Sequence, residues 1–590
     1  MPIKQRTERL REKMKDRGVQ AVVIYAADPH QSEYLPDHWK IREWVSGFTG
    51  SAGFVVIGLK KAGLWTDSRY FIQAEKELKG SGIDLIKMGE KDSPAPWEWL
   101  SDQLSPGDVV YSSAATITPA QRDKFTQSLK KSDISFKIGR GLAEELWNDR
   151  PPLPSVPIYE FKPPFAEQSR TEKLKALREK MKESGAGFFL ATALDEVAYL
   201  LNLRGSDVEC NPVFLSYLLV SDSDCTLFTQ PEKIKGELKS TLSKGGVSIK
   251  TYEQVKEDLK TLGETDSVLV DPTTIGCELY DLIPAKIIEQ RSPVVDMKAI
   301  KPAAAIDHIR NAMARDGAAL FKAFNWLKKE IQHSEIKESD LAEKIAECRA
   351  EQPHYIGESF PAIVGYKGNG AIVHYKPSPE TSSVIQPDGM LLVDSGGQYL
   401  DGTTDITRTL HLSRPTAEEK KNFTLVLKGM IALTKAVFPV KTMGVQLDIL
   451  ARKPLWENGL NFGHGTGHGV GYFLNVHEPP QGIVPNLSER GKTPFKEGMI
   501  TSNEPGYYKT GEYGIRCENL VLCKKAETDG FLQFETLTLF PFERKLIEKE
   551  LLSDSELQWL NRYHQWVCEK LSPLLSESEK GLLREECKPL

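Results

Sequence analysis

Hydrophobic residues recur with helical spacing in two nearly identical charged segments. The first is Leu10-Arg-Glu-Lys-Met-Lys-Asp-Arg-Gly18, and the second is Leu177-Arg-Glu-Lys-Met-Lys-Glu-Ser-Gly185. Apolar residues four positions apart, followed by glycine, predict a helix with a C-terminal cap. The apolar runs Ala21–Tyr25 and Gly187–Ala191 predict a buried strand after each helix. The copies are 167 residues apart (177 − 10), whereas solenoid repeats recur every ~20–50 residues. The pattern therefore favours two duplicated α/β domains over a solenoid, with chance similarity of two amphipathic helices as the alternative.

Two breaks divide the chain into three predicted domains. Six prolines fall within residues 151–164, where neither a helix nor a central strand can continue. A second break lies near Ser292-Pro293 and Lys301-Pro302, and helical spacing resumes in Ala303–Gln332. We therefore expect α/β domains at residues 1–155 and 156–301, followed by a larger mixed (α+β) domain at 302–590. Its end, from about residue 530 and most clearly from Lys545, is expected to form amphipathic helices that pack on a core or on a partner subunit.

Composition and charge narrow the functional classes. The 590 residues carry a net charge of −6, which excludes a generally basic, nucleic-acid-coating protein. Hydrophobic residues at 40% and charged residues at 27% are typical of a globular chain. The eight cysteines form no C-x-x-C pair, so neither a zinc knuckle nor a redox dithiol is indicated. The N-terminus lacks the apolar core of a signal peptide, and no apolar run reaches ~18 residues. We expect a cytoplasmic protein with no membrane and no nucleic-acid partner.

Nucleotide-binding and helical zinc-protease signatures are missing. Gly491-Lys492-Thr493 resembles the end of a phosphate-binding loop, but Asn486 stands where that loop needs its earlier glycine. No G-x-G-x-x-G opens a helix after a strand, and no H-E-x-x-H occurs. Neither a nucleotide-binding site nor a helical zinc-protease site is therefore indicated.

Polar residues that suit chemistry gather between residues 372 and 520. Met390-Leu-Leu-Val-Asp394 is an apolar run that ends in a carboxylate, and Thr403-Thr-Asp405 brings a second carboxylate eleven residues later. Either aspartate alone is more often a turn residue. The stretch Phe462–Gly471 contains His464 and His468 in a glycine-rich setting, and His477 follows. Glycine allows a backbone to approach an ion or a substrate closely, although a flexible connector is the plainer interpretation of such a loop.

Two glutamates complete the candidate set. Glu504 follows the apolar stretch Met499-Ile-Thr-Ser-Asn, and Glu518 lies in Tyr513-Gly-Ile-Arg516-Cys-Glu518, which reads as a strand. The two-residue period of a strand places Arg516 and Glu518 on one face, with Cys517 on the other. Two aspartates, one histidine and two glutamates suit a pair of divalent ions, with Mn²⁺ favoured over Co²⁺ or Zn²⁺ because carboxylates predominate.

These residues, in this order, resemble the dinuclear metallopeptidases of the pita-bread fold, a family that includes methionine aminopeptidase, prolidase and aminopeptidase P. The finer resemblance is to the cytosolic three-domain X-prolyl aminopeptidases, and it spans nearly the whole chain. The segments that carry it are Val45-Ser-Gly-Phe-Thr-Gly-Ser-Ala-Gly, Trp65-Thr-Asp-Ser-Arg69-Tyr, Asn369-Gly-Ala-Ile-Val-His374-Tyr, Asp401-Gly-Thr-Thr-Asp405, His464-Gly-Thr-Gly-His468-Gly-Val-Gly, Asn475-Val-His477-Glu-Pro and Glu504-Pro-Gly-Tyr-Tyr. The resemblance implies two creatinase-like N-terminal domains and a C-terminal pita-bread catalytic domain.

The resemblance also implies a metal-ligand set. Asp394 is expected to ligate one ion, whereas His468 and Glu504 ligate a second. Asp405 and Glu518 are then expected to bridge the two ions, which we expect to be two Mn²⁺ per subunit, with Co²⁺ or Zn²⁺ as substitutes. Four carboxylates balance the +4 charge of two divalent ions. A hydroxide that bridges the ions is implied to attack the peptide carbonyl before proline.

Four further side chains receive expected roles from the resemblance. His374 and His477 are expected to be catalytic and substrate-binding: one hydrogen-bonds the carbonyl or oxyanion, and the other delivers a proton to the leaving proline nitrogen. The sequence does not say which does which. His464 is expected to take part in catalysis and to shape the substrate pocket, with a role behind the ligands as the alternative. Arg69 is expected to reach the substrate from the first domain of the same or a partner subunit, with a structural salt bridge as the alternative.

Arg516 is expected to hold Glu518 in place from behind the ligands. The leading hypothesis is an enzyme that releases the first residue from peptides with proline in the second position. The resemblance also implies a homodimer through the catalytic domain. Prolidase, restricted to dipeptides, is the nearest alternative, and a catalytically dead binding scaffold is the alternative from another class. Methionine aminopeptidase is disfavoured because it needs no ~300 residues ahead of the catalytic domain.

Overall fold

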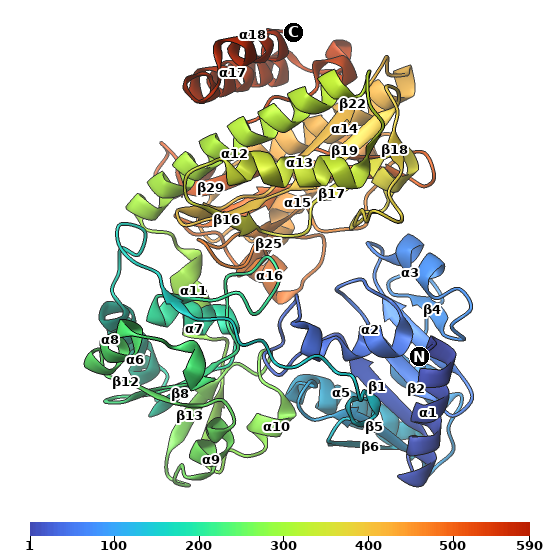
Figure 1. Ribbon diagram of the computed structural model, residues 1–590, viewed down its shortest axis with the longest axis vertical. Helices are drawn as coiled ribbons and strands as arrows, with labels where there is room; N and C mark the ends of the chain where they lie inside the picture. The colour runs from blue at the N-terminus through green and yellow to red at the C-terminus, as the bar shows by residue number, and fades with distance from the viewer. The chain divides into compact units, whose positions relative to one another are not determined.

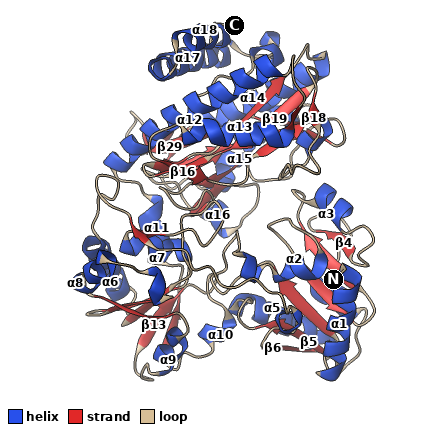
Figure 2. Ribbon diagram, viewed as in Figure 1, coloured by secondary structure: helices blue, strands red, loops and turns tan.

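A computed structural model describes all 590 residues, which form two compact units, Met1–Val295 and Asp296–Leu590 (Figure 1). Helices and strands, blue and red in Figure 2, occur in both units. None of the helices combines the length and the apolar composition needed to cross a membrane.

The first unit opens with a six-stranded sheet in the order β4-β3-β2-β1-β5-β6. Strands β1 and β2 pair antiparallel, as do β2 and β3, whereas the pairs β1–β5, β5–β6 and β3–β4 are parallel. The strands are β1 (Ala21–Tyr25), β2 (Phe54–Gly58), β3 (Ala62–Thr66), β4 (Asp84–Lys87), β5 (Val109–Ser113) and β6 (Ser135–Gly139). The helices are α1 (Ile3–Asp16), α2 (Ile41–Ser46), α3 (Phe71–Glu77), α4 (Pro96–Ser101) and α5 (Pro119–Leu129).

A second six-stranded sheet, in the order β12-β11-β10-β8-β13-β14, repeats this topology strand for strand. Its antiparallel and parallel pairs occupy the same places as in the first sheet. The strands are β8 (Phe188–Ala191), β10 (Tyr217–Ser221), β11 (Cys225–Thr229), β12 (Val247–Thr251), β13 (Ser267–Val270) and β14 (Lys286–Glu289), and β7 (Tyr159–Glu160) pairs separately with β9 (Leu203–Arg204). The helices are α6 (Arg170–Glu183), α7 (Leu194–Leu201), α8 (Glu237–Lys244), α9 (Gln254–Lys260) and α10 (Cys277–Tyr280).

The sequence repeat marks the same structural position in both sheets. Leu10 of α1 and Leu177 of α6 are completely buried. Each helix ends two residues before a glycine with positive φ, Gly18 at +63° and Gly185 at +69°. This left-handed conformation favours glycine and stops the helix. The duplicated α/β domains expected from the repeat are therefore confirmed.

The second unit begins with α11 (Pro293–Ala299), whose first residues belong to the first unit, and contains the longest helix of the chain. Helices α12 and α13 lie side by side over strands of this unit (Figure 1), and α14 packs on α15. The helices are α12 (Ala303–Glu330), α13 (Glu338–Ala350), α14 (Ala417–Thr434), α15 (Gly444–Trp456), α16 (Glu489–Lys492), α17 (Asp554–Leu571) and α18 (Glu577–Glu586). The last two form the expected C-terminal helical region, and their apolar faces join the main core of this unit.

The strands of the second unit form antiparallel sheets that carry the polar residues of interest. The largest has the order β23-β30-β29-β26-β24-β25, and a three-stranded sheet has the order β17-β19-β22. Their strands are β17 (Ile363–Tyr366), β19 (Met390–Ser395), β22 (Ile406–His411), β23 (Val437–Pro439), β24 (Gly467–Gly469), β25 (Glu478–Ile483), β26 (Ile500–Asn503), β29 (Asn519–Lys525) and β30 (Phe531–Thr536). Smaller sheets pair β15 (Ile336–Lys337) with β18 (Val384–Ile385), β27 (Gly506–Lys509) with β28 (Tyr513–Arg516), and β16 (Tyr355–Glu358) with β20 (Gly397–Tyr399) and β21 (Gly402–Thr403).

Candidate metal centre

Two aspartates come from neighbouring strands of the three-stranded sheet. Asp394 lies on β19, the central strand, and pairs in register with Thr407 of β22. Asp405 directly precedes β22. Both are buried, with exposed fractions of 7% and 4%. The antiparallel pairing of β19 and β22 thus brings together two acids that are eleven residues apart in the sequence.

His468 is the middle residue of β24, and steric crowding explains why glycine stands on either side of it. A Cβ on Gly467 would lie 1.9 Å from the carbonyl oxygen of Ser502, and a Cβ on Gly469 would lie 2.3 Å from that of Glu478. Only glycine allows the strand to run so close to its neighbours. The expectation that these glycines permit close backbone approach agrees with this geometry.

The hydrogen bonds of His468 direct one ring nitrogen toward the acids. Its Nδ1 lies 3.0 Å from the carbonyl oxygen of Gly469. A carbonyl oxygen only accepts, so Nδ1 carries the proton and Nε2 is left as the ligand atom. Nε2 lies 3.5 Å from Oδ2 of Asp405 and 3.4 Å from Oε1 of Glu504.

The two glutamates arrive from the larger sheet. Glu504 directly follows β26, where Ser502 donates a hydrogen bond of 3.1 Å to its Oε1. Glu518 lies in the break between β28 and β29 and is 1% exposed. Thr407 donates a hydrogen bond of 2.8 Å to Oε2 of Glu518, which joins this ligand to the three-stranded sheet.

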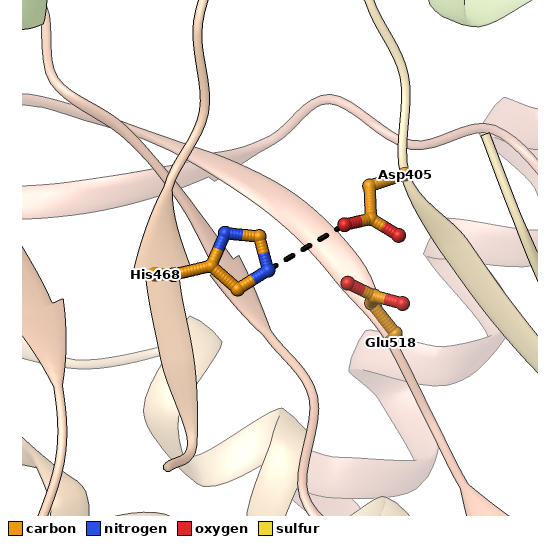
Figure 3. Close-up of side chains that lie close together, drawn as sticks. All are labelled: Asp405, His468 and Glu518. Carbon is orange, nitrogen blue, oxygen red and sulfur yellow. Dashed lines mark ion pairs between the residues drawn. The ribbon is translucent and has the colours of Figure 1, made fainter. Parts of the chain in front are cut away.

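The side chains of Asp405, His468 and Glu518 point toward one another (Figure 3), with ligand atoms within 4.8 Å of each other. This arrangement raises the pKa of Asp405 and of Glu518 well above the ordinary range, through burial first and then through repulsion from neighbouring carboxylates. Burial likewise raises the pKa of Glu504, although the nearby His468 opposes the shift. Bound cations would stabilise such a group of buried carboxylates, which repel one another.

The orphaned atoms of the site fit a metal centre. Oδ1 of Asp394 and Oε1 of Glu518 are buried and have no hydrogen-bond partner in the protein. Buried carboxylate oxygens are normally paired. Unpartnered oxygens on two ligands, together with the unprotonated Nε2 of His468, are the donor atoms that hard or borderline divalent ions take. The residues present therefore fit two divalent ions.

Arg516 lies behind the acids, but on a different partner from the one expected. Its Nη2 donates to Oδ2 of Asp394 at 2.5 Å, its Nε donates to Thr407 at 3.1 Å, and its Nη1 donates to the Tyr508 hydroxyl at 2.7 Å. Its link to Glu518 runs through the Thr407 hydroxyl. The strand breaks at Cys517 and Glu518, and this break ends the two-residue alternation on which the expected direct pairing depended.

The substrate-side histidines occupy different surroundings. The His477 ring lies 4.3 Å from the His468 ring, between centroids, in an edge-on arrangement. His464 is engaged at both nitrogens: Nδ1 with the carbonyl oxygen of Gly465 and Nε2 with the Tyr508 hydroxyl, each at 2.7 Å. His464 thus joins the Arg516 network. His374 is half-buried in a turn after the short 3₁₀ helix Lys367–Ala371.

Arg69 lies in the first unit and has a partner there. Its guanidinium makes two hydrogen bonds, of 2.8 and 2.7 Å, to the carboxylate of Asp67. This is the salt bridge that the sequence left open as the alternative. Contact of Arg69 with substrate stays a prediction.

Sequence reasoning missed two side chains that hold ligands and one that supports them indirectly. Thr407 lies two residues after Asp405, and Ser502 lies two residues before Glu504. In a strand, residues two apart share a face, so buried hydroxyl residues at these offsets were the signal. Tyr508 contacts Arg516 and His464 through its hydroxyl, and no local pattern in the sequence indicates this role.

The fold and the site together define a class: a hydrolase whose clustered carboxylates and histidine hold divalent metal ions. The family model described as "Metallopeptidase family M24" matches residues 307–525, and "Creatinase/Prolidase N-terminal domain" models match residues 6–145 and 149–304. The "C-terminal region of peptidase_M24" matches residues 530–590. The chain belongs to metallopeptidase family M24, in its aminopeptidase P branch, as the following relatives show.

Relatives match over almost the full length. The chain is 40% identical to "Probable Xaa-Pro aminopeptidase P" of Paracoccidioides brasiliensis, over 99% of both chains. It is 40% identical to "Aminopeptidase P2" of Arabidopsis thaliana, over 95% of this chain and 84% of that one. The crystal structure of X-prolyl aminopeptidase from Caenorhabditis elegans, described as a cytosolic enzyme with a di-nuclear active site, superposes with a TM-score of 0.95 at 34% identity over 100% of both chains. The expected family and fold class are confirmed; the three domain boundaries stay predictions.

Proposed function

We propose that the chain is an aminopeptidase that releases the first residue from peptides with proline in the second position. The observation that carries the proposal is the cluster of Asp405, His468 and Glu518, whose ligand atoms lie within 4.8 Å of one another, together with the unpartnered buried oxygens of Asp394 and Glu518. The full-length relatives and the dinuclear neighbour are named for their action on X-Pro substrates. An Xaa-Pro dipeptidase structure from Bacillus anthracis covers only 64% of this chain, at 24% identity and a TM-score of 0.52, and its likeness concerns the fold alone.

In this proposal Asp394 would hold one ion and His468 and Glu504 the other, and Asp405 and Glu518 would be shared between them. Bound divalent ions lower the pKa of a water and polarise the peptide carbonyl. We propose Mn²⁺ as the ion, because the donor set is rich in carboxylates. Replacement of the ion in metal-free protein, with turnover measured for Mn²⁺, Co²⁺ and Zn²⁺ in turn, tests this choice.

The protein's own side chains then do three things. Arg516 fixes the Asp394 carboxylate through a short hydrogen bond and so sets the direction of its free oxygen. The pair His374 and His477 binds the carbonyl oxygen and delivers a proton to the proline nitrogen, which has no hydrogen of its own. His464 supports this site through Tyr508.

We further propose a cytoplasmic enzyme that acts as a homodimer through its catalytic domain. The cytosolic description of the C. elegans enzyme supports the location. Sedimentation of the full chain tests the dimer, and a single monomeric species at micromolar concentration contradicts it.

The substrate experiment compares three peptides on Mn²⁺-loaded protein. We expect release of arginine from Arg-Pro-Pro, and none from Arg-Ala-Pro, in which the second residue is changed. Cleavage of an X-Pro dipeptide alone contradicts the proposal in favour of prolidase. A protein that cleaves none of the peptides and retains no metal is a binding scaffold.

A further inference from the structure

We propose that Glu338 is a positioning residue for His374, because its buried carboxylate fixes both ends of the segment that carries this histidine. The inference rests on the proposed function, in which His374 contacts the substrate. Glu338 is the first residue of α13 and is completely buried.

Four neutral donors surround the Glu338 carboxylate. They are the backbone N–H of Tyr366 (2.7 Å), the side-chain amide of Asn369 (3.0 and 3.1 Å), the hydroxyl of Tyr375 (2.8 Å) and the backbone N–H of Ser383 (2.8 Å). An ionised carboxylate only accepts hydrogen bonds and has room for about four of them. Glu338 is therefore satisfied by the segment itself.

The donors bracket His374 along the chain. Tyr366 ends β17 and Ser383 directly precedes β18, while Asn369 and Tyr375 lie inside the segment between these strands. Tyr375 is the residue after His374. The backbone N–H of Glu338 also donates to the carbonyl oxygen of Ser383 at 3.1 Å, so both the main chain and the side chain of Glu338 hold that end.

The segment is also linked to the metal centre. Nη2 of Arg516 lies 3.5 Å from the carbonyl oxygen of Val373, the residue before His374, and the same nitrogen binds Asp394. The residues on either side of His374 are thus both held, Val373 by Arg516 and Tyr375 by Glu338. This explains why Asn369 and Tyr375 accompany His374 in one short motif.

The charge of Glu338 is needed for this geometry. A buried carboxylate without a cationic partner is costly, and charge-assisted hydrogen bonds from several donors offset that cost. A glutamine replaces one of the two carboxylate oxygens with an NH₂ group. The backbone N–H of either Tyr366 or Ser383, which donate to different oxygens, then faces another donor. Burial and the Glu338 charge raise the pKa of Tyr375, which keeps its hydroxyl protonated and donating.

The test compares variants of the full-length, Mn²⁺-loaded protein on Arg-Pro-Pro. We expect Glu338→Gln to lower kcat by ~10–100-fold, as a displaced catalytic group does, with metal content unchanged. Glu338→Asp, which keeps the charge on a shorter arm, should recover part of the loss. Glu343→Gln, an exposed position on the same helix, should leave turnover unchanged.

A double-variant cycle separates positioning from general damage. If Glu338 acts through His374, Glu338→Gln lowers kcat by less than about twofold in a His374→Ala background, because the effects of coupled residues are non-additive. Equal losses in both backgrounds overturn the inference. Leu341→Ala, a core change on α13, is the control that lowers the melting temperature in the same way as Glu338→Gln. If Leu341→Ala lowers kcat as much as Glu338→Gln does, the inference is also overturned.

Two further comparisons cover the cases in which Glu338→Gln does not fold or the proposed function is wrong. Should Glu338→Gln not fold, Tyr375→Phe removes one donor only and is expected to lower kcat in the same non-additive way. Wild-type protein that does not cleave Arg-Pro-Pro refutes the proposed function. Wild-type protein that cleaves it, with His374→Ala equally active, refutes only the positioning inference.

Discussion

Arg408→Lys should destabilise the catalytic unit far more than a change between two cations ordinarily does. Arg408 lies on β22 and is 1% exposed. The five N–H groups of its guanidinium are shared among six neutral acceptors: the carbonyl oxygens of Thr407 (2.9 Å), Glu518 (2.5 Å), Phe540 (2.7 Å) and Pro541 (3.2 Å), Oδ1 of Asn519 (2.8 Å) and the hydroxyl of Tyr563 (3.0 Å). It therefore joins the main chain beside two site residues to the C-terminal helix α17.

The magnitude follows from the donor count. The guanidinium has five N–H donors and a lysine ammonium has three, so at least two hydrogen bonds are lost. Each hydrogen bond from a charged donor contributes ~1.5 kcal/mol at the low end of its range, which gives about 3 kcal/mol in total. At ~2 °C per kcal/mol for a unit of this size, the melting temperature falls by about 6 °C.

The measurement is thermal unfolding of metal-free protein, so that metal binding does not contribute. Arg414→Lys, an exposed position, is the matched control and should leave the melting temperature within about 1 °C. A fall of less than about 2 °C for Arg408→Lys would show that water or other donors satisfy these acceptors, and the reasoning would be refuted.

Three further perturbations test the site and the core. Glu518→Ala should abolish turnover and leave fewer than two metal ions per chain; near-normal turnover with two ions, by elemental analysis, contradicts the proposed ligand set. Because burial and neighbouring carboxylates raise the pKa of Asp405 and Glu518, protons compete with the ions, so stabilisation by Mn²⁺ should shrink from about pH 8 to about pH 5.5. Stabilisation that grows as the pH falls argues against a carboxylate site. Phe423→Ala, at a completely buried position on α14, should cost ~3–5 kcal/mol in urea unfolding, and a cost below about 1 kcal/mol means that the core refills the space.

The sequence carried the parts of the fold that depend on local pattern. Leu10 and Leu177 with their terminal glycines predicted two helices and, by repetition, two sheets of one topology. The helical spacing in Ala303–Gln332 predicted α12, which the structure ends at Glu330. Such signals depend on neighbours along the chain, which a single sequence displays.

Contacts between segments that are distant in the sequence could not be predicted from such local patterns. Arg516 meets Asp394 across 122 positions, and Glu338 gathers donors up to 45 positions away. The two-residue period assigned Arg516 to Glu518, and a break in the strand removed that pairing. The proposed ligands themselves were identified only by their resemblance to a family, since single buried acids at strand ends have many roles.

The proposed ligands are held by the protein's own hydrogen bonds, and this has a consequence for the metal-free state. The carbonyl oxygen of Glu518 accepts from Arg408, the backbone N–H of His468 donates to Ser502, and the Asp394 carboxylate accepts from Arg516. None of these contacts needs an ion. In a zinc finger, by contrast, metal binding provides the free energy of folding. Here ions add ~2.7 kcal/mol at a hundredfold excess over their dissociation constant, while repulsion among the acids persists without them. Chelation should therefore abolish turnover and lower the melting temperature without unfolding the catalytic unit at 25 °C, and Mn²⁺ should restore activity. Loss of circular dichroism on chelation would show that the ions, and not these hydrogen bonds, hold the site together.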